Sequence, residues 1–429
     1  MRLLWIKSDV LLPLDTGGKL RTWHLLRHLA AHHQVTYLGS AGPHQPTAHI
    51  EGMRQVAHDV QVVPRRDLPP KGSLRFYADA ALRVADPLPY AVGRYRSRAF
   101  ANRLDELLRT RRFDVIVCDF LVPAVNLPRR LPCPSVIFTH NVEAEIWRRH
   151  AETKHGRISR LLYGTQHRRM LRFEARTLAR FDGVLAVSEA DRDTFERLYP
   201  GAVNAPIRVI PTGVDTGFYQ PRPSDRAARS LVFTGSMDWL PNEDAMLFFC
   251  SEVLPLIRRE EPDVTLSIVG RAPTPAVTRL AQQHGITVTG RVDDVRPHMA
   301  NAAVYVVPLR IGGGTRLKIF EAMSMGKAVV STTVGAEGLP VTDGRDVVLA
   351  DDPRAFADAV VRLLRNVDER RALETAARTL VVERYDWAAV AGELERALMD
   401  VADAGIVRRS EAPAPAADAV GANEAHAAH

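Results

Sequence analysis

Short apolar runs alternate with helical stretches along most of this 429-residue chain, and that alternation limits its fold more than any other feature. It is typical of parallel sheets covered by helices, because each parallel strand needs a crossover connection. The first half predicts strands at 3–6, 34–38, 60–63, 115–118, 135–139 and 183–187. The second half predicts strands at 230–235, 264–269, 286–289, 304–307, 328–331 and 346–349. The chain is long enough for each set to have its own core.

Composition narrows the class of protein. A hydrophobic content of 46% and a charged content of 25% fit a soluble globular protein. Residues 1–10 include Lys7 and Asp9 and predict a first strand, not a signal peptide, and no segment is apolar enough to span a membrane. The three cysteines, Cys118, Cys133 and Cys250, are far apart and predict free thiols in a reducing cytoplasm.

A basic stretch lies between residues 145 and 180, where ten Lys or Arg face three Glu, a local charge of +7. Two interpretations remain open. The stretch is either a solvated helix face or a face that docks on anionic lipid. Nucleic acid is a weaker option, because aromatic interleaving and known binding motifs are lacking.

A triple-glycine turn, Gly312–Gly314, follows the predicted strand at 304–307, and a helical run with Arg316, Lys318 and Glu321 comes after it. Glycine lets a backbone approach a ligand closely, and the amides that open a helix favour anions. The turn therefore predicts a phosphate-binding site, with a structural turn followed by a helical charge pair as the alternative.

Polar residues end two predicted strands of the first half. Asp119 follows 115–118, and His140 ends 135–139, at the sheet edge where ligands collect in parallel α/β folds. Ser188 also ends a strand, but with Asp191 it predicts a helix cap. Gly17 and Gly18 open a predicted helix to about residue 32, whose histidines at 24, 28 and 32 we interpret as a polar face.

The Gly-rich turn, Glu321-Ala322-Met323 and the segments 326–332 and 335–339 resemble the donor site of the group 1, family-4 glycosyltransferases. The segment 209–215 resembles their interdomain signature. The resemblance implies an α/β fold of GT-B type, two Rossmann-like domains facing across a cleft, with a C-terminal helix crossing back to the first domain. It divides the chain into an acceptor-side domain (1–207), a nucleotide-sugar-binding domain (208–384), a crossover helix (385–402) and a disordered tail (403–429).

The resemblance also implies roles for residues. His140 would lie at the donor sugar, and Glu321 would bind the ribose hydroxyls. Basic residues that the family usually carries after the 230–235 strand are missing, so Arg316 and Lys318 would reach the diphosphate instead. Gly313 stands where the family usually has a glutamate, which leaves the sugar open. The remaining expected donor contacts are Gly17, Gly18, Gly235, Ser236, Val292, Gly312, Gly313, Gly314, Thr315 and Leu317.

The implied activity is a retaining transfer of a hexose from a UDP- or GDP-sugar to a glycan or lipid-linked acceptor, in exopolysaccharide or envelope polysaccharide assembly. It needs no cofactor and no metal, and places the protein in the cytoplasm, peripherally at the membrane. Three alternatives remain. They are a nucleotide-sugar 2-epimerase of the same fold, a catalytically degenerate scaffold at the membrane, and an NAD-linked oxidoreductase. The last is disfavoured because Gly17-Gly18 lacks the G-x-G-x-x-G spacing.

Overall fold

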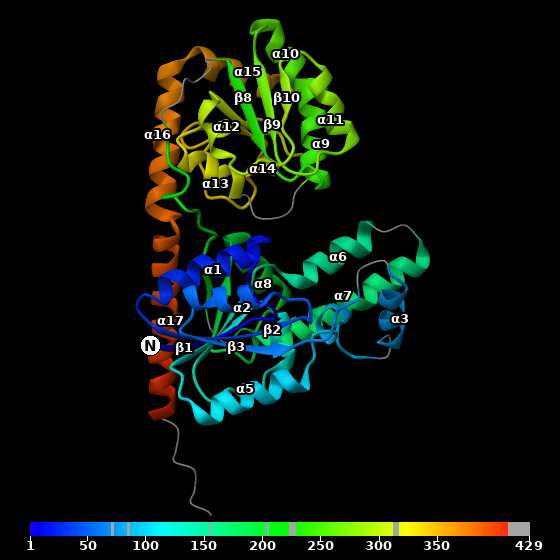
Figure 1. The fold of residues 1–429 in the computed structure, drawn as a ribbon, viewed down its shortest axis with the longest axis vertical. Coiled ribbons are helices and arrows are strands. Elements are labelled where there is room, and N and C mark those ends of the chain that lie inside the picture. Colours follow the sequence, from blue (N-terminus) through cyan, green and yellow to red (C-terminus); the bar gives the residue numbers. More distant parts are fainter. Residues whose placement is uncertain are drawn as a thin grey trace, which may run out of the picture.

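Two parallel β-sheets, each covered by helices, lie one above the other in the computed structural model (Figure 1). The structure describes residues 1–410 apart from 70–72, 84–85, 154–155, 202, 204–205, 223–228 and 312–316. Within these residues, every pair of neighbouring strands in the two sheets is parallel. The predicted fold class, two Rossmann-like units of GT-B type, is confirmed.

The N-terminal sheet has the strand order β3-β2-β1-β4-β5-β6-β7. Its side chains alternate between two cores, because successive residues of a strand point to opposite faces. In β1, Leu3 and Trp5 join the core beneath α1 and α17, whereas Leu4 and Ile6 join the core on the other face. The strands are β1 (Arg2–Ile6), β2 (Gln34–Ala41), β3 (Asp59–Pro64), β4 (Val115–Asp119), β5 (Ser135–Phe138), β6 (Gly183–Ala186) and β7 (Ile207–Val209).

The helices of this domain are α1 (Gly17–Leu29), α2 (Thr47–Gly52), α3 (Leu74–Leu82), α4 (Tyr90–Gly93), α5 (Arg98–Thr110), α6 (Glu143–Thr153), α7 (Arg157–Leu178) and α8 (Glu189–Leu198). The predicted cap of α8 is confirmed, because the Asp191 amide donates to Ser188 Oγ at 3.1 Å. Helices α6 and α7 pack against each other and extend away from the sheet (Figure 1). Their sequence is the basic stretch.

The C-terminal sheet has the order β10-β9-β8-β11-β12-β13, and its core is one continuous cluster. The strands are β8 (Ser230–Thr234), β9 (Thr265–Val269), β10 (Ile286–Val288), β11 (Val304–Val307), β12 (Ala328–Ser331) and β13 (Val348–Leu349). The helices are α9 (Leu240–Phe248), α10 (Leu254–Glu260), α11 (Pro275–Arg279), α12 (Arg296–Asn301), α13 (Leu317–Ser324), α14 (Thr333–Ala336), α15 (Pro353–Arg365), α16 (Val367–Arg384) and α17 (Trp387–Ser410).

The chain passes between the domains twice, and the two passages are joined to each other. The Val214 amide donates to the Tyr385 carbonyl at 2.7 Å, and the Trp387 amide donates to the Val214 carbonyl at 3.2 Å. After this junction α17 runs back along the N-terminal domain and packs on α1 (Figure 1). The helix continues to Ser410, so residues 403–410 do not belong to a disordered tail, and residues 411–429 lie outside the described residues.

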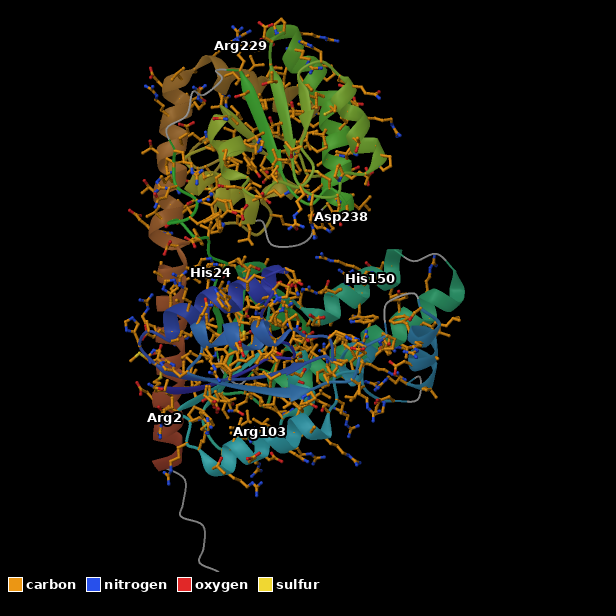
Figure 2. All side chains as sticks on the ribbon, in the orientation of Figure 1. Arg2, His24, Arg103, His150, Arg229 and Asp238 are labelled. Carbon is orange, nitrogen blue, oxygen red and sulfur yellow. The ribbon has the colours of Figure 1, made fainter. Side chains whose placement is uncertain are left out.

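The histidine face of α1 is not simply polar surface. The ring of His24 stacks on Trp387 with parallel planes and centroids 5.1 Å apart, and Figure 2 shows His24 on the side of α1 next to α17. Burial lowers the pKa of His24, which favours the neutral form of the stacked ring. This face of α1 therefore helps to attach the crossover helix.

Candidate active site

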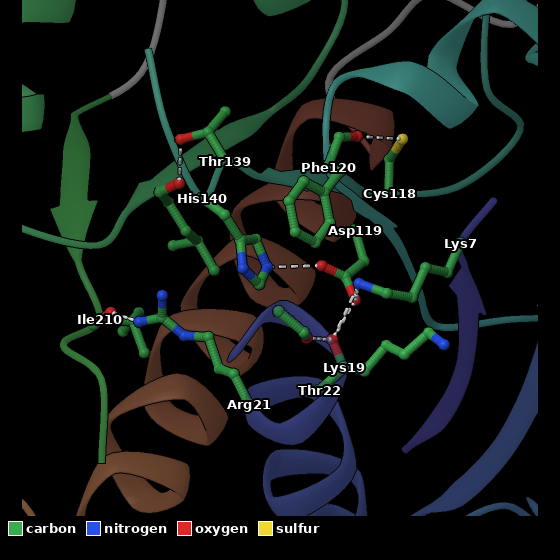
Figure 3. A network of polar contacts seen from close by, with 12 residues as sticks. Lys7, Lys19, Arg21, Thr22, Cys118, Asp119, Phe120, Thr139, His140 and Ile210 are labelled. Atoms are coloured by element: carbon green, nitrogen blue, oxygen red, sulfur yellow. Dashed lines mark hydrogen bonds and ion pairs between the residues drawn. The ribbon is translucent and has the colours of Figure 1, made fainter. Parts of the chain in front are cut away.

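A buried carboxylate, that of Asp119, is the centre of the polar site in the N-terminal domain (Figure 3). It lies at the carboxyl end of β4, next to the end of β5, where parallel α/β sheets place ligands. His140 Nε2 lies 2.7 Å from its Oδ1. Oδ2 accepts from Lys7 Nζ at 2.7 Å, from Thr22 Oγ1 at 2.6 Å and from Trp5 Nε1 at 3.0 Å.

The positive charge of Lys7 balances the negative charge of Asp119. Burial alone would raise the pKa of Asp119, but Lys7 and His140 hold it well below its usual range, so the carboxylate stays ionised. Burial lowers the pKa of Lys7 and is opposed by the adjacent carboxylate. Burial lowers the pKa of His140 to about 3, against the opposing effect of Asp119. The imidazole is therefore neutral near pH 7, beside an ion pair of no net charge.

Phe120 fixes the plane of the histidine ring. Its backbone adopts φ = +77°, a conformation that is strained for a residue with a side chain. In this position its ring stacks on His140 with centroids 3.7 Å apart, and Lys7 Nζ lies 4.0 Å from the Phe120 centroid. Gly18 leaves room for the stack, since a Cβ there would lie 2.6 Å from Phe120 Cζ.

Two pockets adjoin His140. The first, of about 510 Å³, lies within the N-terminal domain and is lined by Gly17, Gly18, Tyr95 and Asn141 among others. The second, of about 260 Å³, lies between the domains. It is lined by His140 and Asp191 of the N-terminal domain, by Thr212 of the connecting segment, and by Leu317, Phe320 and Glu337 of the C-terminal domain. His140 thus stands where the N-terminal site opens toward the second domain, and Leu317 lies on the opposite wall.

Lys318 belongs to α13, and its ammonium reaches the carboxyl end of β8. Its Nζ donates to Asn242 Oδ1 at 2.7 Å and lies 4.2 Å from the Phe233 ring centroid. The same ammonium would lie 3.0 Å from a Cβ at Gly235. The side chain thus occupies the place after the first strand of this domain where the sequence has no basic residue.

Ser236 follows Gly235 and contacts two charged residues. Its Oγ donates to Asp238 Oδ1 at 2.6 Å and accepts from Arg271 Nε at 2.7 Å. Asp238 lies at the edge of the upper domain that faces the lower one (Figure 2). Arg271 therefore adds a second cation near the predicted diphosphate site.

Glu321 lies on α13, partly buried, and accepts a hydrogen bond from the Tyr219 hydroxyl. Burial raises its pKa, while Tyr219 and Lys318 oppose the change. A carboxylate with one donor still has acceptor sites for two further hydroxyls. Val292 is partly buried against the core of its domain. The turn residues Gly312, Gly313, Gly314, Thr315 and Arg316 lie outside the described residues, so their predicted roles stay predictions.

Several site residues were missed by the sequence reasoning. Lys7 follows β1 and Arg271 follows β9. Both could have been found from the sequence, because ligands bind beyond the carboxyl ends of parallel strands. Tyr219 and Asn242 carried no such signal, because only the fold brings them to α13. Among the described residues, no group of three His, Cys, Asp or Glu is placed to hold a metal ion. The three cysteines are buried thiols, and none forms a disulfide with a described residue, as predicted.

Two facing Rossmann-like domains, a polar site at the cleft between them and a last helix that crosses back define the GT-B class of fold. Anabaena Alr3699/HepE, solved in complex with UDP, has a similar fold, with a TM-score of 0.63 and 15% identity over 93% of this chain and 100% of that chain.

The chain belongs to the group 1 glycosyltransferases. Residues 228–366 match the family model described as Glycosyl transferases group 1, and residues 16–218 match Glycosyltransferase Family 4.

Two curated relatives are named as mannosyltransferases. The phosphatidyl-myo-inositol mannosyltransferase of Mycobacterium leprae is 33% identical over 237 residues, 52% of this chain and 60% of the relative. The GDP-mannose-dependent alpha-(1-6)-phosphatidylinositol monomannoside mannosyltransferase of Mycobacterium tuberculosis is 28% identical over 238 residues, 50% of this chain and 60% of the relative. The match thus spans less than two thirds of each relative.

Proposed function

We propose that the protein transfers a hexose from a nucleoside-diphosphate sugar to a hydroxyl acceptor with retention of anomeric configuration. The observation that carries the proposal is the interdomain pocket, where neutral His140 faces α13, the helix of Lys318 and Glu321. In this arrangement Lys318 and Arg316 bind the diphosphate, Glu321 binds the ribose, and His140 lies against the sugar. Cationic groups at the leaving phosphate stabilise the charge that develops there.

GDP-mannose is the donor we propose first, because two relatives are mannosyltransferases and one is named for GDP-mannose. A UDP-hexose is the alternative, since Alr3699/HepE was solved with UDP. Titration calorimetry with GDP, UDP, GDP-mannose and UDP-glucose tests both, with NAD⁺ as the negative control. Micromolar binding of NAD⁺ alone would contradict the proposal.

The reaction itself is tested by incubation with the donor that binds, followed by NMR of the products. Transfer to an acceptor, or slow release of the free sugar, supports a transferase, and an α-linked product from an α-linked donor demonstrates retention. Conversion of the donor into its 2-epimer would instead identify an epimerase. Binding without any turnover would identify a scaffold.

We propose a glycan or lipid-linked acceptor, in exopolysaccharide or envelope polysaccharide assembly. The support is the resemblance of the donor-site motifs and the lipid acceptors in the relatives' names. Membrane-extracted lipid and oligosaccharide fractions, offered with a radiolabelled donor, identify the acceptor. Labelling of neither fraction would contradict this assignment.

We further propose that the cytoplasmic leaflet is contacted through α7. Arg168, Arg172 and Arg176 are exposed at helical spacing on one face, and none of the three forms an ion pair with a described residue. Leu161, two turns before Arg168 on the same face, is 65% exposed. Within the described part of the chain, no helix is both long and apolar enough to cross a bilayer. Exposed leucine beside a cationic stripe suits shallow contact with an anionic surface.

Exposed leucines on α3 extend this surface. Leu74 and Leu82 are 89% and 85% exposed, and α3 lies beside α7 in Figure 1. The two helices are linked through Tyr90, whose ring meets Phe76 and whose amide donates to Gln166 Oε1 at 2.7 Å.

Vesicle co-sedimentation tests the docking. We expect pelleting with anionic vesicles at low salt, release at high salt, and loss in the triple variant Arg168→Glu, Arg172→Glu, Arg176→Glu. Each basic residue near an anionic surface contributes at most about 1 kcal/mol, so binding is reversible. A matched control changes Arg259, Arg279 and Arg371 of the C-terminal domain to Glu, because these three are also exposed and form no ion pair with a described residue. Equal pelleting with neutral vesicles, or equal loss in the control, would leave α7 a solvated face.

A further inference from the structure

The two oxygens of Asp119 have different partners, and this division limits what His140 can do. Oδ2 accepts from Lys7, Thr22 and Trp5, all of them donors. Oδ1 faces His140 Nε2 at 2.7 Å. An ionised carboxylate can only accept, so the neutral imidazole must carry its proton on Nε2. Nδ1 is then left as a bare acceptor.

The bare nitrogen lies near a lining residue of the N-terminal pocket. His140 Nδ1 lies 3.8 Å from the position of a Cβ on Gly18, the glycine that helps to line that pocket. Phe120 covers one ring face and holds the ring plane, and a half-turn of the imidazole within that plane would break the contact with Asp119. The surrounding contacts thus hold both the tautomer and the orientation of the ring.

We propose that Asp119 is a positioning residue: it keeps His140 in the Nε2–H tautomer, so that Nδ1 accepts a hydrogen bond from a hydroxyl of the bound sugar. This inference rests on the proposed function. An acceptor at this place fits sugar transfer in two ways. It binds a hydroxyl without adding a proton to the site, and it puts no positive charge beside a sugar that becomes cationic in the transition state.

The partners of Asp119 make a sharp prediction for Asp119→Asn. Lys7 Nζ and Trp5 Nε1 can only donate hydrogen bonds. The amide oxygen of the substituted side chain must therefore face them, and its NH₂ group must face His140. Nε2 then becomes the acceptor and the proton moves to Nδ1. The substitution is nearly isosteric, yet it inverts the tautomer and turns the acceptor in the pocket into a donor.

The tautomer is measured directly by ¹⁵N-edited NMR of the histidine rings at pH 7, without substrate. The chain has 15 histidines, so the His140→Asn variant assigns the signal. In the wild-type protein we expect protonated Nε2 and bare Nδ1. Protonated Nδ1 in the wild-type protein would overturn the proposal, and this measurement needs no variant of Asp119 to fold.

Kinetics separate positioning from a merely structural role. For Asp119→Asn we expect kcat to fall about ten- to hundredfold, the scale of a lost charged hydrogen bond, with GDP affinity within twofold of wild type. In a His140→Asn background the same substitution should cost no further activity, because the tautomer it controls is gone. Two results would overturn the proposal. One is a fall in kcat on Asp119→Asn that is as large in the His140→Asn background as in wild type, and the other is an unchanged kcat although the tautomer is inverted.

Thr139→Val is the matched control. Thr139 is buried next to His140 and donates to the Leu185 carbonyl at 2.8 Å, without touching Asp119. The variant should lower the melting temperature while the tautomer and kcat stay as in wild type. A wild-type protein with the expected tautomer but no transfer activity would overturn the proposed function and leave the tautomer assignment standing.

Discussion

Replacing Lys318 by Met tests the diphosphate site most directly. Met keeps an unbranched apolar side chain of similar length and removes the ammonium, which lies over Phe233 and donates to Asn242. A charge-assisted hydrogen bond to a phosphate contributes about 1.5–3 kcal/mol, which corresponds to about a 10- to 150-fold weaker Kd. We expect this loss for GDP and for GDP-mannose alike, because both carry the diphosphate. Asn242 still donates to the Ser236 carbonyl at 2.8 Å, so the loop keeps one of its bonds.

The assay is calorimetric titration of both ligands into wild type and variant, beside a control at Arg310. Arg310 follows β11 as a nearby cation, but its guanidinium donates to both oxygens of Asp244, at 3.0 and 2.5 Å. Arg310→Met should therefore leave both affinities within about twofold of wild type. Wild-type affinity in Lys318→Met, or an equal loss in the two variants, would refute the assignment of Lys318 to the diphosphate.

Three further predictions concern other parts of the protein. Glu321→Gln should weaken nucleoside diphosphate and nucleotide-sugar equally by titration; loss of turnover with unchanged GDP affinity would place Glu321 at the sugar instead. Turnover should survive EDTA in a donor-consumption assay, because basic residues supply the charge at the phosphates; abolition with rescue by Mg²⁺ or Mn²⁺ would contradict this. Gly213→Ala should lower the melting temperature by several degrees, because a Cβ there would lie 2.6 Å from Trp387 Cε3 and overpacking costs about 1–3 kcal/mol; an unchanged melting temperature would show that the junction yields.

The sheets could be predicted from the sequence because strands buried on both faces are almost continuously apolar. Strand β7 was missed, because its three residues are too short for a pattern. The end of α17 was also missed. Its Ala-rich continuation favours helix, and loss of apolar periodicity does not end a helix that is already formed.

The site was predicted in part for a similar reason. Residues at strand ends, such as Asp119 and His140, could be found one by one, since the rule on strand ends is local. Their contact could not, because it depends on β4 and β5 being neighbours, and sequence order does not give sheet order. The bond between Tyr219 and Glu321 joins segments that only the folded second domain brings together.

The charges of the two domains differ in a way that suits the proposed reaction. At the N-terminal site, the ion pair of Lys7 and Asp119 has no net charge, His140 is neutral, and the nearby guanidinium of Arg21 donates to the Ile210 carbonyl. At the C-terminal site, Lys318 and Arg271 supply cations near the end of β8. A sugar that leaves a diphosphate becomes more positive while the phosphate becomes more negative. A neutral acceptor on the sugar side and cations on the phosphate side stabilise that separation of charge, whereas a protonated His140 would oppose it. This is why control of a single proton on His140, rather than an added charge, is the role that the geometry of Asp119 supports.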